Sequence, residues 1–267
     1  MPLYIDHTFD TPPVRIAIWH ISETPEQLVE QIPDGRVLLV EAESRFRSVS
    51  RRLEWLAVRR LLHHLIGRTD ICYSPLGRPY LPPCEGLGGG GCDYFHVPIA
   101  CMVNGRSIDD YTNSSLSISI SHTRNYAAVA LSESPVGLDI EQRTERVLKV
   151  RSRYVSPLEE KDFVSSSAKR QLDALLLLWS AKETMYKLLD NPELDFAQNL
   201  EAQPFRLHDE RGTYTEVTPP VPIAEFTDAD SLPYFEARTQ GVFIPDKQFR
   251  IHYHFFPDFV LTVSLFE

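Results

Sequence analysis

The sequence predicts an α+β protein built from two similar lobes, residues 1–133 and 134–267, each holding a long helix and several mostly antiparallel strands. Helical patterns over residues 50–66 and 168–189 supply one long helix to each half. Short stretches typical of strands lie before and after both helices. A Ser-Glu-Ser-Pro turn at residues 132–135 separates the halves, and a junction of two lobes is a usual location for a ligand cleft.

Local signals mark the elements of the first half. Thr24 is a favourable N-cap for a short helix over residues 25–32. Leucines recur at helical spacing over residues 50–66, and Gly67 ends that helix. The remaining expectations are strands over residues 14–21, 116–120 and 126–131, the last two as a hairpin, and a long loop or insertion over residues 82–115.

The second half opens with a strand over residues 136–141. Ser156, Pro157 and Glu159 then give the signal of a helix start, with a serine cap, proline at the first helical position and glutamate at the third. The longest helix follows over residues 168–189. Strand-like stretches in the tail cover residues 214–217, 234–238, 249–256 and 260–266.

Composition excludes several classes of function. A net charge of −10 over 267 residues argues against bulk binding of nucleic acid, which needs a broad basic surface. No apolar run reaches the roughly 18 residues of a membrane span, and residues 1–10 do not have the pattern of a signal peptide. The four cysteines, which lack any Cys-x-x-Cys spacing, are expected to be free thiols in a reducing cytoplasm: Cys72, Cys84, Cys92 and Cys101.

Two segments combine acidic and basic residues in a way that points to chemistry. Asp139 and Glu141 are two apart on the predicted strand, so both side chains project to the same side. Trp179, Glu183 and Lys187 are four apart along one stripe of the longest helix. If this stripe packs over the strand, three carboxylates converge beside a lysine. Hard oxygen ligands with an ammonium group suit a phosphate ester or diphosphate bound through Mg²⁺.

Each of these features also has a simpler interpretation. The two acids could lie on an exposed strand face, and Glu183 with Lys187 could form an ordinary helix ion pair worth a few tenths of a kcal/mol. Ser121 and His122 point opposite ways on an extended chain, so they cannot form a catalytic dyad, although each could bind a phosphate. An arginine-rich stretch at residues 45–68 is either a solvated helix face or an anion site.

Five short motifs follow one another in an order that carries more information than each motif alone. They are Gly77-Arg78-Pro79, Ser121-His122, Gly137-Leu138-Asp139-Ile140-Glu141, Ser156-Pro157-Leu158-Glu159 and Trp179-Ser180-Ala181-Lys182-Glu183 with Lys187. In this order they resemble the motifs of the surfactin-type 4′-phosphopantetheinyl transferases. The Asp-x-Glu pair followed by Trp-x-x-Lys-Glu is the specific part. Three positions depart from the family pattern: Thr123 for a serine, Val155 for an aromatic residue, and Leu138 for a valine or isoleucine.

The resemblance implies a pseudo-dimeric fold of two similar α/β lobes with the active site in the cleft between them. The implied reaction moves the phosphopantetheine arm of coenzyme A to a serine of an apo acyl or peptidyl carrier protein and releases 3′,5′-ADP. It implies Mg²⁺, with Mn²⁺ as a possible substitute, and no nucleic acid or membrane partner. Fatty acid biosynthesis is one pathway in which such a carrier works, and a monomer would suffice because the two lobes are fused.

The resemblance also implies roles for individual residues. The metal ligands would be Asp139, Glu141 and Glu183. Contacts to coenzyme A would come from Arg51 or Arg52, Arg78, Ser121, His122 and Lys187. The base that takes the serine proton would be Glu183 or a water that it holds, with Glu159 as the rival and Lys182 beside the metal site. Two other functions use the same residues: a metal-dependent hydrolase of phosphate esters, and a non-catalytic module that binds coenzyme A or a carrier protein.

Overall fold

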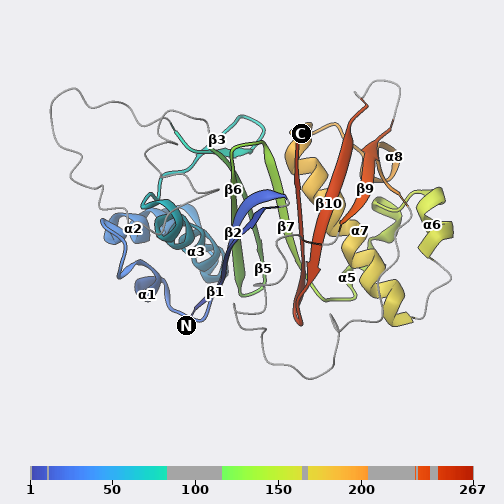
Figure 1. Cartoon of the computed structure of the whole chain (residues 1–267). Coiled ribbons are helices and arrows are strands. Elements are labelled where there is room, and N and C mark those ends of the chain that lie inside the picture. Colours follow the sequence, from blue (N-terminus) through green and yellow to red (C-terminus); the bar gives the residue numbers. More distant parts are fainter. Residues whose placement is uncertain are drawn as a thin grey trace. The chain divides into compact units, whose positions relative to one another are not determined.

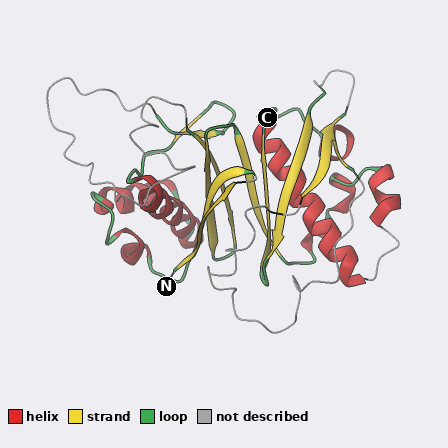
Figure 2. Ribbon diagram, viewed as in Figure 1, coloured by secondary structure: helices red, strands yellow, loops and turns green. Residues whose placement is uncertain are grey.

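A computed structural model of the chain describes residues 2–10, 12–82, 116–163, 168–203, 232, 234–240 and 246–266. The chain divides into two compact units, Met1–Ser134 and Pro135–Glu267. Helices and antiparallel sheets occur in both units (Figure 2), which confirms the expected mixed class. None of the described helices is long and apolar enough to cross a membrane. The predicted loop at residues 82–115, apart from residue 82, and the predicted strand at residues 214–217 lie outside the described residues.

The first unit contains a four-stranded antiparallel sheet in the order β1-β2-β6-β5. The four strands are β1 (Leu3–Asp10), β2 (Pro13–His20), β5 (Ser117–Thr123) and β6 (Tyr126–Ser132). Strands β5 and β6 form the hairpin expected from the sequence, with Ser121 opposite Ala128. Strand β1 was not predicted, because its apolar residues are interrupted by Asp6 and His7.

Helices on one side of this sheet complete the first unit (Figure 1). They are α1 (Pro25–Val29), α2 (Gly35–Arg45) and α3 (Val49–Ile66), followed by the short strands β3 (Cys72–Tyr73) and β4 (Pro79–Tyr80). Thr24 caps α1 through a capping box with Gln27, and α3 ends at Gly67, whose φ of 69° suits glycine. The buried leucines of α3 pack with β2 and β6, as the helical pattern predicted.

The second unit contains a five-stranded antiparallel sheet in the order β7-β11-β10-β9-β8. Its strands are β7 (Val136–Gln142), β8 (Leu200–Ala202), β9 (Tyr234–Thr239), β10 (Gln248–Phe255) and β11 (Phe259–Leu265). Its helices are α5 (Arg146–Lys149), the 3₁₀ helix η1 (Arg151–Arg153), α6 (Pro157–Phe163), α7 (Ala168–Leu189) and α8 (Phe196–Asn199). The strands and the two helices expected for this half are confirmed, apart from the strand outside the described residues.

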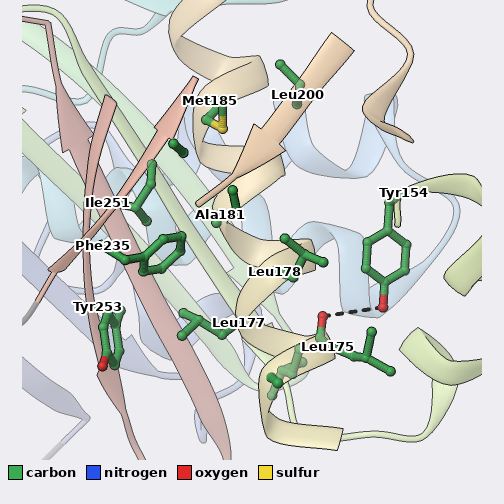
Figure 3. Close-up of a cluster of buried hydrophobic side chains, with 14 of the residues drawn as sticks. Tyr154, Leu175, Leu177, Leu178, Ala181, Met185, Leu200, Phe235, Ile251 and Tyr253 are labelled. Carbon is green, nitrogen blue, oxygen red and sulfur yellow. Dashed lines mark hydrogen bonds between the residues drawn. The ribbon is translucent and has the colours of Figure 1, made fainter. Parts of the chain in front are cut away.

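Helix α7 packs lengthwise on one face of this sheet (Figure 1). Leu177, Ala181 and Met185 of α7 lie in one buried cluster with Phe235 and Ile251 of the sheet (Figure 3). Burying a large aliphatic or aromatic side chain contributes about 1.5–3 kcal/mol, so this cluster fixes α7 firmly to the sheet. The residues that α7 presents to β7 are therefore held on a rigid support.

The side chain of Tyr154 links α7 to the segment before α6. The hydroxyl of Tyr154 donates to the carbonyl oxygens of Val147 (3.1 Å) and Leu175 (3.3 Å), and the latter bond is drawn in Figure 3. Tyr154 is fully buried, so its hydroxyl needs these partners. The bonds tie the segment before α6 to α7. The internal similarity of the two lobes and a cleft between them stay predictions.

Candidate functional site

Strand β7 carries the two acids that the sequence singled out. Leu138 and Ile140 are buried on one face of the strand, and Asp139 and Glu141 alternate with them on the other. Asp139 is only 6% exposed. The simpler interpretation of an exposed acidic strand face is therefore wrong for Asp139, and a buried carboxylate needs partners.

A glycine lets α7 approach β7 closely. A Cβ atom on Gly137 would lie 2.4 Å from the carbonyl oxygen of Thr184 and 2.9 Å from Cγ of Leu188. No larger residue fits between this strand and this helix without a shift of the backbone. The close approach places the polar stripe of α7 directly against Asp139 and Glu141.

Asp139 is held by α7 at both carboxylate oxygens. Nζ of Lys187 donates to Oδ1 of Asp139 (2.9 Å) and to the carbonyl oxygen of Leu138 (2.7 Å). Oγ of Ser180 donates to Oδ2 of Asp139 at 2.8 Å. Lys187 thus forms its ion pair with the strand, and the alternative of a helix ion pair with Glu183 is wrong.

Glu141 is held by a tryptophan of the same helix. Nε1 of Trp179 donates to Oε2 of Glu141 at 3.0 Å, and the backbone N–H of Gln142 donates to Oε1 at 3.1 Å. Burial and the neighbouring charge of Asp139 raise the pKa of Glu141, although the bond from Trp179 opposes this shift. The two strand acids are therefore close enough to repel each other.

Glu183 is the third carboxylate of the group. Burial raises its pKa to about 7, and the charges of Asp139 and Glu141 add to the shift while Lys187 opposes it. Glu183 makes no hydrogen bond or ion pair with any residue in the described part of the chain. It is therefore the member of the group whose oxygens have no internal partner there.

The donor set can be compared with what a divalent cation requires. Three carboxylates face one ammonium group, which leaves excess negative charge that a hard cation would neutralise. Among the described residues, no three Asp, Glu, His or Cys side chains already converge closely enough to hold a metal ion. The chemistry of the donors thus fits Mg²⁺, while Lys187, Ser180 and Trp179 hold the carboxylates in this structure.

Glu159 and Lys182, two predicted catalytic residues, form a separate pair in the core. Nζ of Lys182 lies 2.8 Å from Oε2 of Glu159, and the side chains are 0% and 1% exposed. Oε1 of Glu159 accepts the backbone N–H of Ala202 at 2.9 Å. Oε2 and Ser156 form the capping box that starts α6, as predicted. Glu159 is thus fully engaged by its own chain.

The predicted contacts to coenzyme A lie in the first unit, apart from Lys187. Nη1 of Arg51, on α3, lies 3.2 Å from Nε2 of His122 on β5 and 3.1 Å from Oε2 of Glu54. The same oxygen of Glu54 is 3.5 Å from Nδ1 of His122. The structure therefore brings Arg51 and His122 together, with a carboxylate between them that the sequence did not indicate.

The remaining predicted contacts of the first unit are Arg52, Ser121 and Arg78. Nε of Arg52 donates to the carbonyl oxygen of Phe46 at 2.7 Å, so this guanidinium is bound by its own chain. Ser121 is buried while His122 is exposed, as expected for neighbours on a strand. The backbone of Arg78 closes a turn with Ser74. A single site that draws on both units stays a prediction.

Sequence reasoning missed two residues of the second unit. Ser180 stands inside the Trp-x-x-Lys-Glu motif and bonds to Asp139, but no role was assigned to it. Oγ1 of Thr262, on β11, lies 2.8 Å from Oγ of Ser180. The alternation of Thr262 and Ser264 with apolar residues on this strand marked a polar face, but its partner 82 residues away could not be read from that pattern.

Comparison with known proteins adds an independent finding. A model of the 4′-phosphopantetheinyl transferase superfamily matches residues 135–257. The 4′-phosphopantetheinyl transferase psf-1 of Bacillus pumilus is 35% identical over 74 residues, which are 28% of this chain and 32% of that protein. A 4′-phosphopantetheinyl transferase of Bacillus subtilis and the 4′-phosphopantetheinyl transferase Sfp of its strain 168 are each 32% identical over 68 residues, 26% of this chain and 30% of each relative.

These matches show what the second unit is similar to. The second unit is similar to the 4′-phosphopantetheinyl transferase superfamily over residues 135–257, and the expected likeness to the surfactin type is confirmed. The matching segments span about a third of the length of these curated relatives. The matched residues 135–257 include Asp139, Glu141, Glu183 and Lys187.

Proposed function

We propose that this protein transfers the 4′-phosphopantetheine group of coenzyme A to a serine of an apo acyl or peptidyl carrier protein. The observation that carries this proposal is the group of three carboxylates and one ammonium at Asp139, Glu141, Glu183 and Lys187, within the segment that matches the superfamily. A diphosphate substrate needs both a hard cation and a basic side chain, and this group supplies the means to bind both.

Asp139, Glu141 and Glu183 are the residues that would hold Mg²⁺, or Mn²⁺ in its place. The chemistry that the cation supplies when bound is neutralisation of the diphosphate charge, which favours departure of 3′,5′-ADP. Lys187 contributes a second positive charge at the edge of the same group, since its side chain is 27% exposed. An ammonium at that position is suited to a phosphate oxygen.

The transfer itself exchanges one bond for another. The serine oxygen of the carrier bonds to phosphorus, the bond from phosphorus to 3′,5′-ADP breaks, and the serine proton must be accepted by a base. Glu183, or a water that it holds, is the proposed base, because its carboxylate lies beside Asp139 and makes no hydrogen bond or ion pair with any described residue. Glu159 is a weaker candidate, since Lys182, Ser156 and Ala202 already engage its oxygens.

The first unit would contribute contacts to the nucleotide part of coenzyme A. Arg51 and His122 are the proposed phosphate contacts, because they lie together and are exposed. Ser121 and Arg78 are further proposed contacts from the sequence motifs. Arg52 is less suited to this role, because Phe46 already binds its guanidinium.

Carrier docking is proposed to use basic residues of the same unit. Carrier proteins of this class are typically acidic, whereas this chain has a net charge of −10, so a local basic surface is needed. Residues 45–60 contain six arginines, but Arg59 is buried against Trp55, with its guanidinium 3.2 Å from the ring centroid. Arg47 and Arg60 remain as testable positions. Charge reversal at both should raise the KM for the carrier, and an unchanged KM would refute this docking surface.

One experiment separates the proposed reaction from its alternatives. The full chain is incubated with coenzyme A, Mg²⁺ and an apo carrier protein, and the carrier is then weighed by mass spectrometry. A carrier heavier by one phosphopantetheinyl group supports the transferase. Free phosphate without a heavier carrier would favour a hydrolase, and tight binding of coenzyme A without product would favour a binding module.

A variant of the first metal ligand tests the site itself. Asp139→Ala removes a carboxylate that both Lys187 and Ser180 contact, so transfer should be abolished. Retained transfer by this variant would contradict the assignment of Asp139.

A further inference from the structure

A chain of three hydroxyl groups runs beneath Asp139 and joins α7 to β11. Oγ of Ser180 lies 2.8 Å from Oγ1 of Thr262, which in turn lies 2.7 Å from Oγ1 of Thr184. All three side chains are fully buried, at 0% exposure. Thr262 is also the residue directly opposite Asp139 in the pairing of β11 with β7. The chain therefore ends at the carboxylate proposed to bind the cation.

The direction of these hydrogen bonds follows from the number of protons. A carboxylate can only accept, so the single hydroxyl proton of Ser180 is committed to Oδ2 of Asp139. Oγ of Ser180 must then act as an acceptor, and the donor is the hydroxyl of Thr262. This hydroxyl lies within reach of both Oγ and the carbonyl oxygen of Ser180. Thr262 can in turn accept from Thr184. Bonds aligned in one direction polarise one another and strengthen the last one.

The two carboxylate oxygens of Asp139 have different partners. Oδ2 is fixed by Ser180 on the buried side. Oδ1 accepts from Lys187, whose side chain is 27% exposed, on the side open to solvent. The orientation of Oδ1 is therefore set by the hydroxyls behind it, and partners behind a metal ligand control its affinity for the metal.

We infer that Thr262 is a positioning residue that orients the Asp139 carboxylate for a divalent cation by directing the hydroxyl of Ser180. The inference rests on the proposed function, because it takes Asp139 as a ligand. Thr262 lies beyond residues 135–257, where the match to the superfamily ends. It acts through Ser180 and touches neither substrate nor cation.

A matched pair of variants tests the inference. Thr262→Val removes the hydroxyl and keeps the shape of the side chain. Ser264→Ala is the control, because Ser264 lies two residues along the same strand and is equally buried. Its hydroxyl has no hydrogen-bond partner in the part of the chain that the structure describes. Both variants remove one buried hydroxyl from one face of β11.

The readout is the affinity for Mn²⁺ in the absence of coenzyme A. It is measured from the electron paramagnetic resonance signal of the free ion. Thr262→Val should weaken Mn²⁺ binding by roughly 10- to 100-fold, the usual effect of removing a partner behind a ligand. Ser264→Ala should leave Mn²⁺ binding unchanged, and Thr262→Ser, which keeps the hydroxyl, should restore it. Wild-type affinity in Thr262→Val, even with a lower melting temperature, would overturn the inference and leave only a packing role.

A double variant tests the route through Ser180. Ser180→Ala alone should weaken Mn²⁺ binding, and adding Thr262→Val should cause no further loss, because both changes break the same chain. Additive losses would overturn the inference, as would absence of Mn²⁺ binding by the wild-type protein. Failure of the transferase assay with Mn²⁺ binding still dependent on Thr262 would instead reject the proposed function and retain the positioning role.

Discussion

The ammonium of Lys182 lies 2.8 Å from a carboxylate oxygen of Glu159, and both side chains are fully buried in the second unit. Lys182 also donates to the carbonyl oxygens of Tyr154 (2.6 Å) and Phe196 (2.9 Å). The pair thus connects α7 to the start of α6 and to the segment at α8. Its geometry is that of a structural ion pair, which favours a positioning role for both residues.

Glu159→Gln should therefore act on stability more than on chemistry. The substitution leaves the buried ammonium of Lys182 without a counter-charge, which costs about 3–5 kcal/mol. Thermal unfolding should show a large fall in melting temperature, while kcat of the folded fraction falls only modestly and keeps its pH profile. Glu160→Gln is the control, since Glu160 is partly exposed and pairs with Arg151 on the surface. Loss of the acidic limb of the pH–rate profile in Glu159→Gln, where the rate rises as a base loses its proton, would instead identify Glu159 as the base.

Gly137→Ala should separate α7 from β7. The new Cβ would lie 2.4 Å from the carbonyl oxygen of Thr184, so the helix must move away from the strand that carries Asp139. Such overpacking costs about 1–3 kcal/mol, and Mn²⁺ affinity should fall together with the melting temperature. Adding Leu188→Ala should not restore either quantity, because the clash with the backbone oxygen remains. Wild-type behaviour of Gly137→Ala would show that the helix tolerates a larger separation.

Glu183→Gln should change how stability depends on pH. The pKa of Glu183 is raised in the folded protein, by burial first and by Asp139 and Glu141 in addition, from 4.5 to about 7. Because the folded state binds the proton more tightly than the unfolded state, stability is lost as pH rises through this window. Glu183→Gln has no carboxyl group at this position and does not lose this stability. Its melting temperature should therefore exceed that of the wild type by little near about pH 5 and by more near about pH 8, both measured in buffer with a chelator.

The control for this experiment is Glu193→Gln, at an exposed loop position. It removes the same formal charge without removing a buried carboxyl group. A difference between Glu183→Gln and wild type that stays constant with pH would contradict the raised pKa.

The sequence predicted those elements whose signals are local. The start of α6 followed from Ser156, Pro157 and Glu159, and the structure has the same capping box. Helix α2 was missed because its only buried residues are Gly35 and Ala42, while Val37 and Val40 are each 65% exposed. Its apolar residues therefore do not mark a face toward the core.

The periodicity of the strand and of the helix predicted part of the site. Alternation on β7 placed Asp139 and Glu141 on one face, and helical spacing placed Lys187 over them, as the 2.9 Å contact with Asp139 confirms. Periodicity could not distinguish a partner on the strand from Glu183 on the same helix. It also could not bring Thr262 beneath the site, because that contact depends on the pairing of β11 with β7. Which residues the folded protein uses as ligands stays a prediction.

Glu54→Gln should tighten binding of 3′,5′-ADP. Arg51 can only donate, so Nε2 of His122 accepts from it and the ring proton at Nδ1 faces Glu54. Glu54 is thus a carboxylate already bound between two proposed phosphate contacts, and a phosphate must compete with it. Removing one charge pair of this kind is worth up to about 1 kcal/mol, or a gain in affinity of roughly 2- to 5-fold by calorimetry.

The control is Glu41→Gln, which breaks the exposed pair of Glu41 with Arg45 and should leave the affinity unchanged. Weaker binding by Glu54→Gln would show that Glu54 orients Arg51 for the phosphate and does not compete with it.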